Sequence, residues 1–89
     1  MIRETIVIQN ESGLHARPAA TFVRLASKFQ SNITLIKDGI EINGKSILGV
    51  MTLAAEKGST ITLTADGEDE EKALSRLSNF LTSCEEQNV

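Results

Sequence analysis

The sequence is poor in the residues that build disulfides, metal centres and aromatic clusters. It has no Trp or Tyr, three Phe, one Pro, one His and one Cys among its 89 residues. A lone Cys excludes an internal disulfide, and one His with one distant Cys cannot supply a metal site, so we expect no metal and no cofactor. With so few aromatic residues, aliphatic side chains must fill the core.

Long hydrophobic runs are also absent. The opening stretch MIRETIVIQN alternates polar and apolar residues, unlike the apolar segment of a signal peptide, and no run approaches the length of a membrane span. The net charge is −3, and no Lys/Arg cluster stands beside stacking aromatics. We therefore expect a cytoplasmic protein with no nucleic-acid partner and no membrane insertion. The length predicts a single domain over residues 1–89.

Alternating hydrophobicity predicts four short strands, over residues 2–8, 33–37, 40–43 and 60–65. The Asp38-Gly39 pair between the second and third segments is typical of a tight hairpin turn that needs positive backbone angles. Each strand has one apolar side, which predicts a sheet buried on one face only.

Helical spacing predicts two amphipathic helices. The first carries an apolar stripe of Ala19, Phe22, Val23, Ala26 and Phe29, and the second carries Ala73, Leu74, Leu77, Phe80, Leu81 and Cys84. The acidic residues 68–71 suit the N-terminus of the second helix, and a shorter helix fits residues 47–53 with Ser46 as its cap. The expected order is β-α-β-β-α-β-α, an α+β fold in which three helices cover one face of a largely antiparallel sheet.

The stretch GIEINGKS, residues 39–46, matches the pattern of a phosphate-wrapping nucleotide loop. Such a loop must follow a buried strand and lead into a long helix. Here Ile40 and Ile42 alternate as a strand inside the supposed loop, so we interpret the match as accidental.

The most informative stretch is SGLHARPAA, residues 12–20, which holds the only His and the only Pro. Proline is favoured in the first turn of a helix, so Pro18 predicts that a helix begins close to His15. The unpaired N–H groups of Ala16 and Arg17 then disfavour the imidazolium cation and favour an anion beside the ring. Arg17 is unfavourable at a helix N-terminus unless something negative binds there. One interpretation is a phosphoryl or anion site, and the other is that His15 only caps the helix.

The stretches GLHARPA and NGKSILGVM, followed by a Lys-Gly pair and a strand, resemble the HPr family, the histidine-containing phosphocarriers of the bacterial phosphoenolpyruvate-dependent phosphotransferase system. The resemblance covers nearly the whole chain except the tail from about residue 83. It implies an open-faced β-sandwich with strand order 1-4-2-3. It also implies a stoichiometric carrier, not an enzyme, that acts as a monomer.

By this resemblance, His15 becomes a phosphohistidine at Nδ1, accepting phosphate from phosphorylated Enzyme I and passing it to an EIIA-type domain. Arg17 holds the phosphoryl group together with the Ala16 and Arg17 amides and the Ser12 hydroxyl. Ser46 matches a serine that HPr kinase/phosphorylase modifies in many bacteria, which adds a regulatory phosphosite to its role as a helix cap.

Too many apolar residues follow Ser46 for so short a helix to bury on one side. We expect some of them to face water and to form, with one face of the first helix, a docking surface for partner proteins. Arg17, Arg24 and Lys28 share one face of the first helix, which is either a basic edge that steers the protein toward acidic partners or an ordinary solvated face. The predicted interface residues are Ala20, Arg24, Ile47, Leu48 and Met51.

A second class of function remains open at this point. The chain can instead be a regulatory or docking module of a nitrogen-related phosphorelay or of transcriptional control, in which the His15 region only binds a partner. A phosphate that appears on the wild type but not on His15→Ala separates the two.

Overall fold

The helices and strands follow one another in the predicted order. The structure, a computed structural model, describes residues 1–9, 13–53 and 55–82. The elements are β1 (Ile2–Val7), α1 (Ala16–Ala26), β2 (Asn32–Lys37), β3 (Ile40–Asn43), α2 (Ile47–Leu53), β4 (Thr60–Asp66) and α3 (Glu70–Thr82).

Element ends differ from the prediction by a few residues. Ile8 falls outside β1, yet it continues the pairing of that strand, because Ile8 N–H donates to Ser59 O at 2.9 Å and Ile8 O accepts from Gly58 N–H at 2.8 Å. The apolar stripe of the first helix was expected to run to Phe29, whereas α1 ends at Ala26 and Phe29 is half-buried beyond it. Cys84, predicted as the last apolar position of α3, lies outside the described residues.

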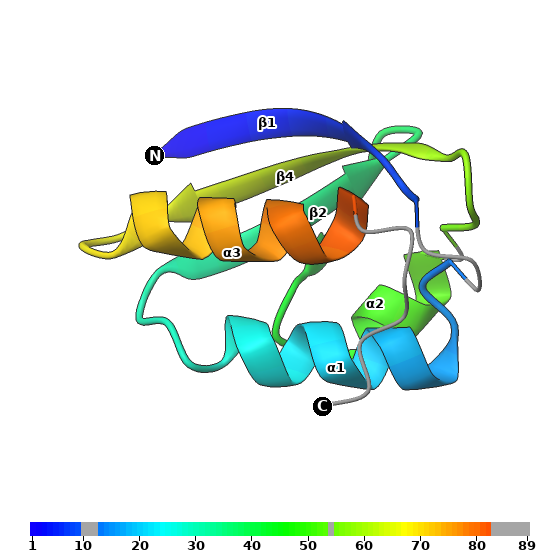
Figure 1. The fold of residues 1–89 in the computed structure, drawn as a ribbon, viewed down its shortest axis with the longest axis horizontal. Helices are drawn as coiled ribbons and strands as arrows, with labels where there is room; N and C mark the ends of the chain where they lie inside the picture. Colours follow the sequence, from blue (N-terminus) through cyan, green and yellow to red (C-terminus); the bar gives the residue numbers. More distant parts are fainter. Residues whose placement is uncertain (10–12, 54, 83–89) are drawn as a thin grey trace.

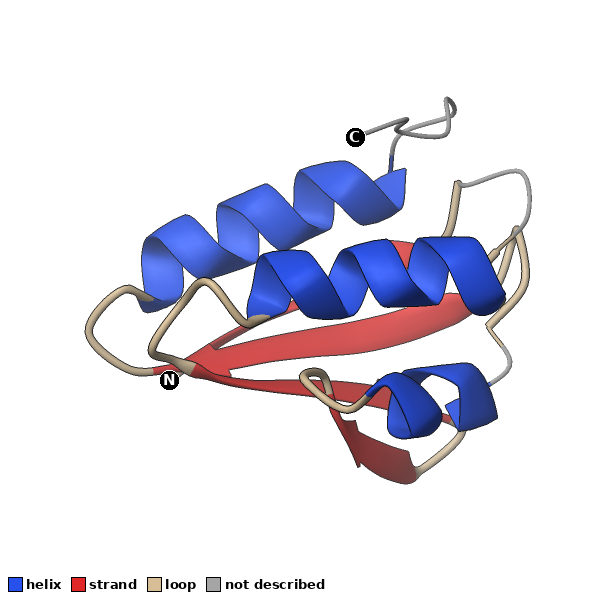
Figure 2. Ribbon diagram, turned by 90° about the horizontal axis from the view of Figure 1, so that it is seen from below, coloured by secondary structure: helices blue, strands red, loops and turns tan. Residues whose placement is uncertain are grey.

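The four strands form one antiparallel sheet in the order β1-β4-β2-β3, which confirms the predicted topology. Leu35 is paired with Leu63 and Ile6 with Ile61, and all four side chains are buried on the same face of the sheet. Figure 2 shows α1 and α3 lying against one face of the sheet. The alternating strands predicted this two-layer packing, and the family resemblance implied the open-faced sandwich.

The core lies between the sheet and the two long helices. Phe22 of α1 is fully buried, and its ring centroid is 6.4 Å from that of Phe80 on α3. Leu77 and Leu81 of α3 are fully buried as well. Aliphatic side chains make up most of the remaining core, as the scarcity of aromatic residues indicated.

The hairpin between β2 and β3 has the predicted geometry. Asp38 has φ of 52° and Gly39 has φ of 80°, the two positive angles that a tight primed turn needs. The strand β3 that follows occupies Ile40–Asn43, inside the segment that matched a nucleotide loop. The strand predicted inside that segment is therefore confirmed, which supports the interpretation of the match as accidental.

Helices α1 and α3 run in opposite directions, so the start of α3 and the start of α1 lie at opposite ends of the molecule (Figure 1). At the α3 end, the Asp69 carboxylate accepts hydrogen bonds from Gln30 N–H at 2.9 Å, from Ser31 N–H at 3.0 Å and from the Ser31 hydroxyl. These bonds, the Ser31 hydroxyl first, hold the pKa of Asp69 below its ordinary value. These hydrogen bonds, called the Asp69 clamp below, link the loop after α1 to the start of α3.

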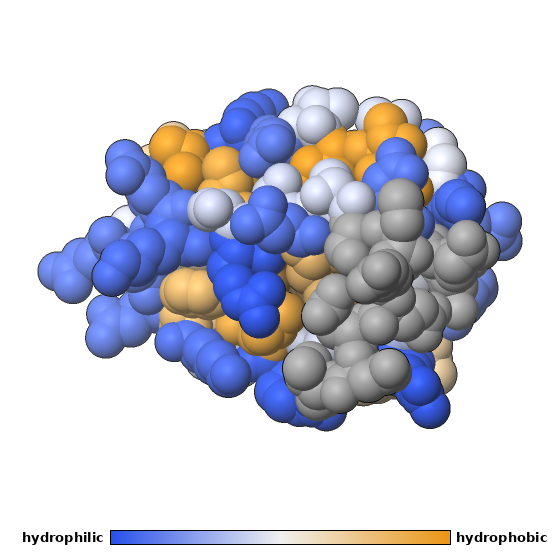
Figure 3. All heavy atoms as spheres, in the orientation of Figure 1, coloured by the Kyte–Doolittle hydropathy of each residue, from blue (hydrophilic) through white to orange (hydrophobic). Residues whose placement is uncertain are grey.

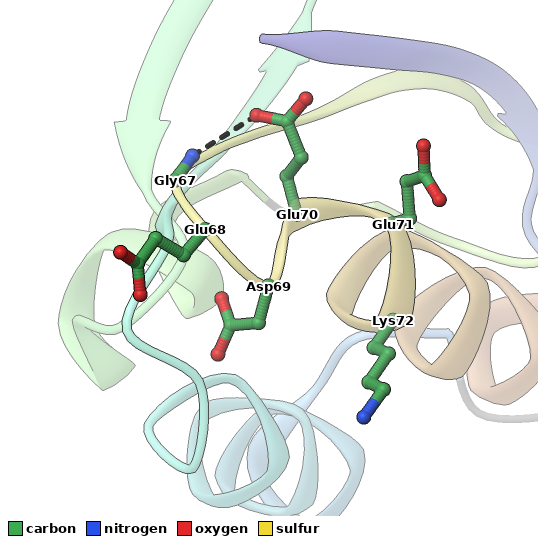
Figure 4. Close-up of a pocket in the computed structure, with 6 residues that line it drawn as sticks. All are labelled: Gly67, Glu68, Asp69, Glu70, Glu71 and Lys72. Carbon is green, nitrogen blue, oxygen red and sulfur yellow. Dashed lines mark hydrogen bonds between the residues drawn. The ribbon is translucent and has the colours of Figure 1, made fainter.

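Two hollows lie near this end. One, of about 390 Å³, is lined by residues 67–72, where Glu70 turns back to accept a hydrogen bond from Gly67 N–H at 3.0 Å (Figure 4). Its four carboxylates outnumber its one Lys, which makes it unsuitable for a phosphate. The other, of about 470 Å³, is lined by Phe29 and by side chains of α3, and hydrophobic surface shows between α1 and α3 in Figure 3.

Two further properties bear on function. No helix among the described residues is both long and apolar enough to cross a membrane. Within the same part of the chain, His, Cys, Asp and Glu side chains do not gather in threes where they could hold a metal ion.

Candidate functional site

His15 stands at the junction between the loop and α1. It is the N-cap residue, with φ of −83° and ψ of −163°, and its carbonyl accepts the Ala19 N–H at 2.8 Å. Its side chain makes no capping hydrogen bond and is exposed to solvent. The backbone of His15 thus starts the helix, while its ring is not used by the helix and is accessible to a reaction partner.

The backbone before His15 is fixed by the segment after α2. Leu14 N–H donates to Ala55 O at 2.7 Å, and the Leu14 side chain is fully buried. Gly13 has φ of 63°, and a Cβ at this position would lie 2.5 Å from Ala55 O and 2.7 Å from the Glu56 Cα. Only glycine fits this close approach of two backbones. His15 therefore extends from an anchored stretch of chain.

The first turn of α1 presents N–H groups with no intrahelical acceptor. These belong to Ala16 and Arg17, since Pro18 has none and Ala19 is bonded to His15. Pro18 is buried and fixes the start of the helix, whereas Ala16 and Arg17 are exposed. Together with the positive end of the helix dipole, this turn favours an anion close to the His15 ring.

Two of the three side chains predicted to contact a phosphate can be placed. His15 and Arg17 lie on either side of Ala16, both exposed at the start of α1. The ion pairs found among the described residues involve other groups, so none of them occupies the Arg17 guanidinium. Ser12, the third, lies outside the described residues.

Ser46 is the N-cap of α2, as predicted. Its hydroxyl accepts the Gly49 N–H at 3.1 Å, and its carbonyl accepts the Val50 N–H at 2.9 Å. The side chain is half-buried. The neighbouring Lys45 ammonium donates to Phe29 O at 2.7 Å. This hydrogen bond links the segment before α2 to the loop after α1.

Helix α2 lies beside the start of α1 (Figure 1). Of its apolar residues, Val50 and Leu53 are buried, while the exposed fractions are 42% for Ile47, 74% for Leu48 and 41% for Met51. The prediction that part of this helix faces water is confirmed. On α1, Arg24 is exposed and Ala20 is half-buried. Lys28, counted with the basic edge of α1, lies past its end.

Sequence reasoning missed two parts of this site, Gly13 with its close approach to the segment after α2, and the hydrogen bond from Leu14 to Ala55. The only signal in the sequence was a glycine two residues before the histidine. That signal could indicate a backbone angle, but not the partner 42 positions further along the chain (13 to 55).

A helix that begins at an exposed histidine, with amides and an arginine beside it, is suited to binding an anion such as a phosphoryl group. The family model described as "PTS HPr component phosphorylation site" matches residues 2–83. A phosphocarrier protein HPr of Xylella fastidiosa is 50% identical over 80 residues, which cover 90% of each chain. An HPr-like protein Crh of Bacillus subtilis is 44% identical over 81 residues, covering 91% of this chain and 95% of the relative.

Solved structures agree with these sequence relatives. HPr-C-His from Thermoanaerobacter tengcongensis superposes with a TM-score of 0.90 at 48% identity, over 94% of each chain. Crh of Bacillus subtilis, described as a dimer with a swapping domain, gives a TM-score of 0.76 at 42% identity over 98% of this chain and all of the other. The chain belongs to the HPr family, whose members are phosphocarriers of the phosphotransferase system and not enzymes.

Proposed function

We propose that this protein carries a phosphoryl group on His15, which it accepts from phosphorylated Enzyme I and passes to an EIIA-type domain. The observation that carries the proposal is the exposed ring of His15 at the N-cap of α1, with no capping hydrogen bond. The ring nitrogen Nδ1 attacks phosphorus, a P–N bond forms, and the bond to the donor breaks. The work of the protein is to position the ring and to offer complementary charge.

The product is stabilised where the first turn of α1 begins. The phosphoryl oxygens accept hydrogen bonds from the Ala16 and Arg17 N–H groups, and the Arg17 guanidinium adds a charge-assisted bond. The Ser12 hydroxyl is proposed as a further contact. A positively charged side chain at a helix N-terminus costs about 0.3–1 kcal/mol, a cost that a bound phosphate reverses.

The test is direct. The protein is incubated with phosphoenolpyruvate and Enzyme I, and the product is examined for a phosphate that is labile in acid and stable in base. We expect one phosphate per chain on the wild type and none on His15→Ala. A wild-type protein that stays unmodified, while a known carrier is phosphorylated in the same mixture, would rule the proposal out.

Partner proteins dock on the surface formed by α1 and α2. Ile47, Leu48 and Met51 supply exposed apolar area, Ala20 lies on the neighbouring helix, and Arg24 supplies positive charge. Arg24→Glu should lower the association rate with Enzyme I and weaken its dependence on salt, because rim charges act mainly on encounter. An unchanged rate at both low and high salt would remove Arg24 from this role.

The carrier acts as a monomer in the cytoplasm.

Ser46 is proposed as a regulatory phosphosite for an HPr kinase/phosphorylase. A phosphate there brings about −1.5 to −2 charges beside a docking surface that uses exposed apolar groups, so it should weaken binding to Enzyme I. Incubation with the kinase and ATP, followed by mass analysis of the wild type and of Ser46→Ala, decides whether the site is used.

A regulatory role without phosphoryl transfer is the second candidate. Its support is the similarity to proteins named Crh, which is comparable in extent to the similarity to HPr proteins. In that role the α1–α2 surface binds a partner, and His15 acquires no phosphate. The Enzyme I experiment separates the two roles.

A further inference from the structure

Gly13 and Leu14, the two residues directly before His15, contact the peptide group that joins Ala55 to Glu56. Its carbonyl oxygen accepts the Leu14 N–H at 2.7 Å. Its N–H donates to the hydroxyl oxygen of Ser59 at 2.9 Å. Both ends of this peptide are therefore bonded, one to the residue before His15 and the other to the Ser59 side chain.

Ser59 is itself firmly placed. Its N–H donates to Glu56 O at 2.8 Å, which closes a turn over residues 56–59 in which Gly58 has φ of 91°. The turn is bonded to Ile8 just after β1, through Ile8 N–H to Ser59 O at 2.9 Å and Gly58 N–H to Ile8 O at 2.8 Å. The hydrogen bonds to Ile8 thus fix the position from which the Ser59 hydroxyl accepts the Glu56 N–H.

Gly13 packs against the same peptide. A Cβ on Gly13 would come within 2.7 Å of the Glu56 Cα, so the two backbones lie in direct contact. A rotation of the Ala55–Glu56 peptide would disturb both the hydrogen bond from Leu14 N–H and the contact with Gly13. Because Leu14 is bonded directly to His15 along the chain, this rotation would shift the imidazole relative to the first turn of α1.

We propose that Ser59 is a positioning residue for phosphoryl transfer at His15, acting through the Ala55–Glu56 peptide. The inference rests on the proposed function. Its physical basis is that phosphoryl transfer depends on in-line alignment, for which a displacement of about 1 Å can cost about 10²-fold in rate. The Ser59 hydroxyl fixes the orientation of the peptide, and the peptide fixes the backbone from which the ring extends.

The experiment compares three variants as substrates of Enzyme I. Ser59→Ala removes the hydroxyl, Ser59→Thr keeps it, and Ser31→Ala removes a hydroxyl from the Asp69 clamp at the other end of the molecule. We expect Ser59→Ala to lower kcat about tenfold with little change in KM, since the docking surface is intact. Ser59→Thr should stay within about twofold of the wild type. Ser31→Ala should lose stability without losing kcat.

A second measurement follows the backbone directly. Hydrogen exchange of the Leu14 amide should be faster in Ser59→Ala than in wild type or Ser59→Thr, because the acceptor of that amide is less well held. Wild-type kcat in Ser59→Ala, with the wild type itself phosphorylated, would overturn this inference and leave the proposed function intact. A loss of kcat in Ser31→Ala equal to that in Ser59→Ala would also overturn it, since the effect would then follow stability alone. A wild type that acquires no phosphate would overturn both.

Discussion

Replacing Ser46 by Ala should destabilise the protein by about 1 kcal/mol. The substitution deletes the hydroxyl that accepts the Gly49 N–H at 3.1 Å at the start of α2. Loss of a serine N-cap costs about 0.5–2 kcal/mol. The middle of that range applies here because α2 has only seven residues, has no acidic side chain in its first turn, and positions buried Val50 and Leu53. For a domain of this size, 1 kcal/mol corresponds to a fall of about 4–8 °C in Tm.

Thermal and urea unfolding of three variants test this reasoning. Ser46→Asp should retain most of the wild-type stability, since aspartate caps as well as serine and its charge suits the helix N-terminus. Thr52→Ala removes a different hydroxyl of the same helix, which bonds to Leu48 O at 2.6 Å, and should be close to neutral because Ala is the better helix former. A Tm for Ser46→Ala equal to that of the wild type would refute the capping argument. A large loss in Thr52→Ala would indicate that any change in α2 is destabilising.

Three further predictions concern the starts of α1 and α3. Arg17→Ala should slow phosphoryl transfer from Enzyme I about tenfold, the loss expected for one charge-assisted hydrogen bond. In urea unfolding, its stability should be unchanged or raised by a few tenths of a kcal/mol, because a positive charge leaves the helix N-terminus. His15→Asn should raise stability by about 0.5–1 kcal/mol, because Asn is a favoured N-cap, and should abolish phosphate uptake measured by mass. Asp69→Asn should be less stable than wild type near pH 7. The difference in stability should shrink as the pH falls through 3.8 and below, because the Asp69 carboxylate stabilises the fold only while it is ionised, and its pKa is lower in the folded protein. Equal pH profiles for wild type and Asp69→Asn would contradict the last prediction.

Local patterns were sufficient to predict the helices and strands and their order along the chain. The Asp38-Gly39 pair indicated the hairpin because few other dipeptides adopt two positive φ angles, and those angles are found. Alternation in residues 60–65 indicated β4, since one side of that strand must be buried. The order of strands in the sheet was not available from such patterns, because it depends on pairings between segments far apart in sequence. It came from the family resemblance.

The long-range contacts between loops could not be predicted. The acidic residues 68–71 predict favourable charges at the start of α3, yet the Asp69 side chain bonds to Gln30 and Ser31 on another loop. The contact between Gly13 and the Ala55–Glu56 peptide is of the same kind, a meeting of two loops. Periodicity reports which face of an element is buried, but it does not report which loop lies against which.

The N-cap residues of α1 and α2 differ in how the side chain is used, and the difference bears on function. Ser46 has a favoured capping side chain, and its hydroxyl is bonded to Gly49 N–H. His15 occupies the same position in α1, is not a favoured capping residue, and forms no capping bond with its ring. A Ser, Asp or Asn at position 15 would stabilise α1, so the protein with histidine there is less stable than it could be. Such a cost in stability is expected where a side chain serves chemistry and not folding, and it supports the proposal that His15 carries the phosphoryl group.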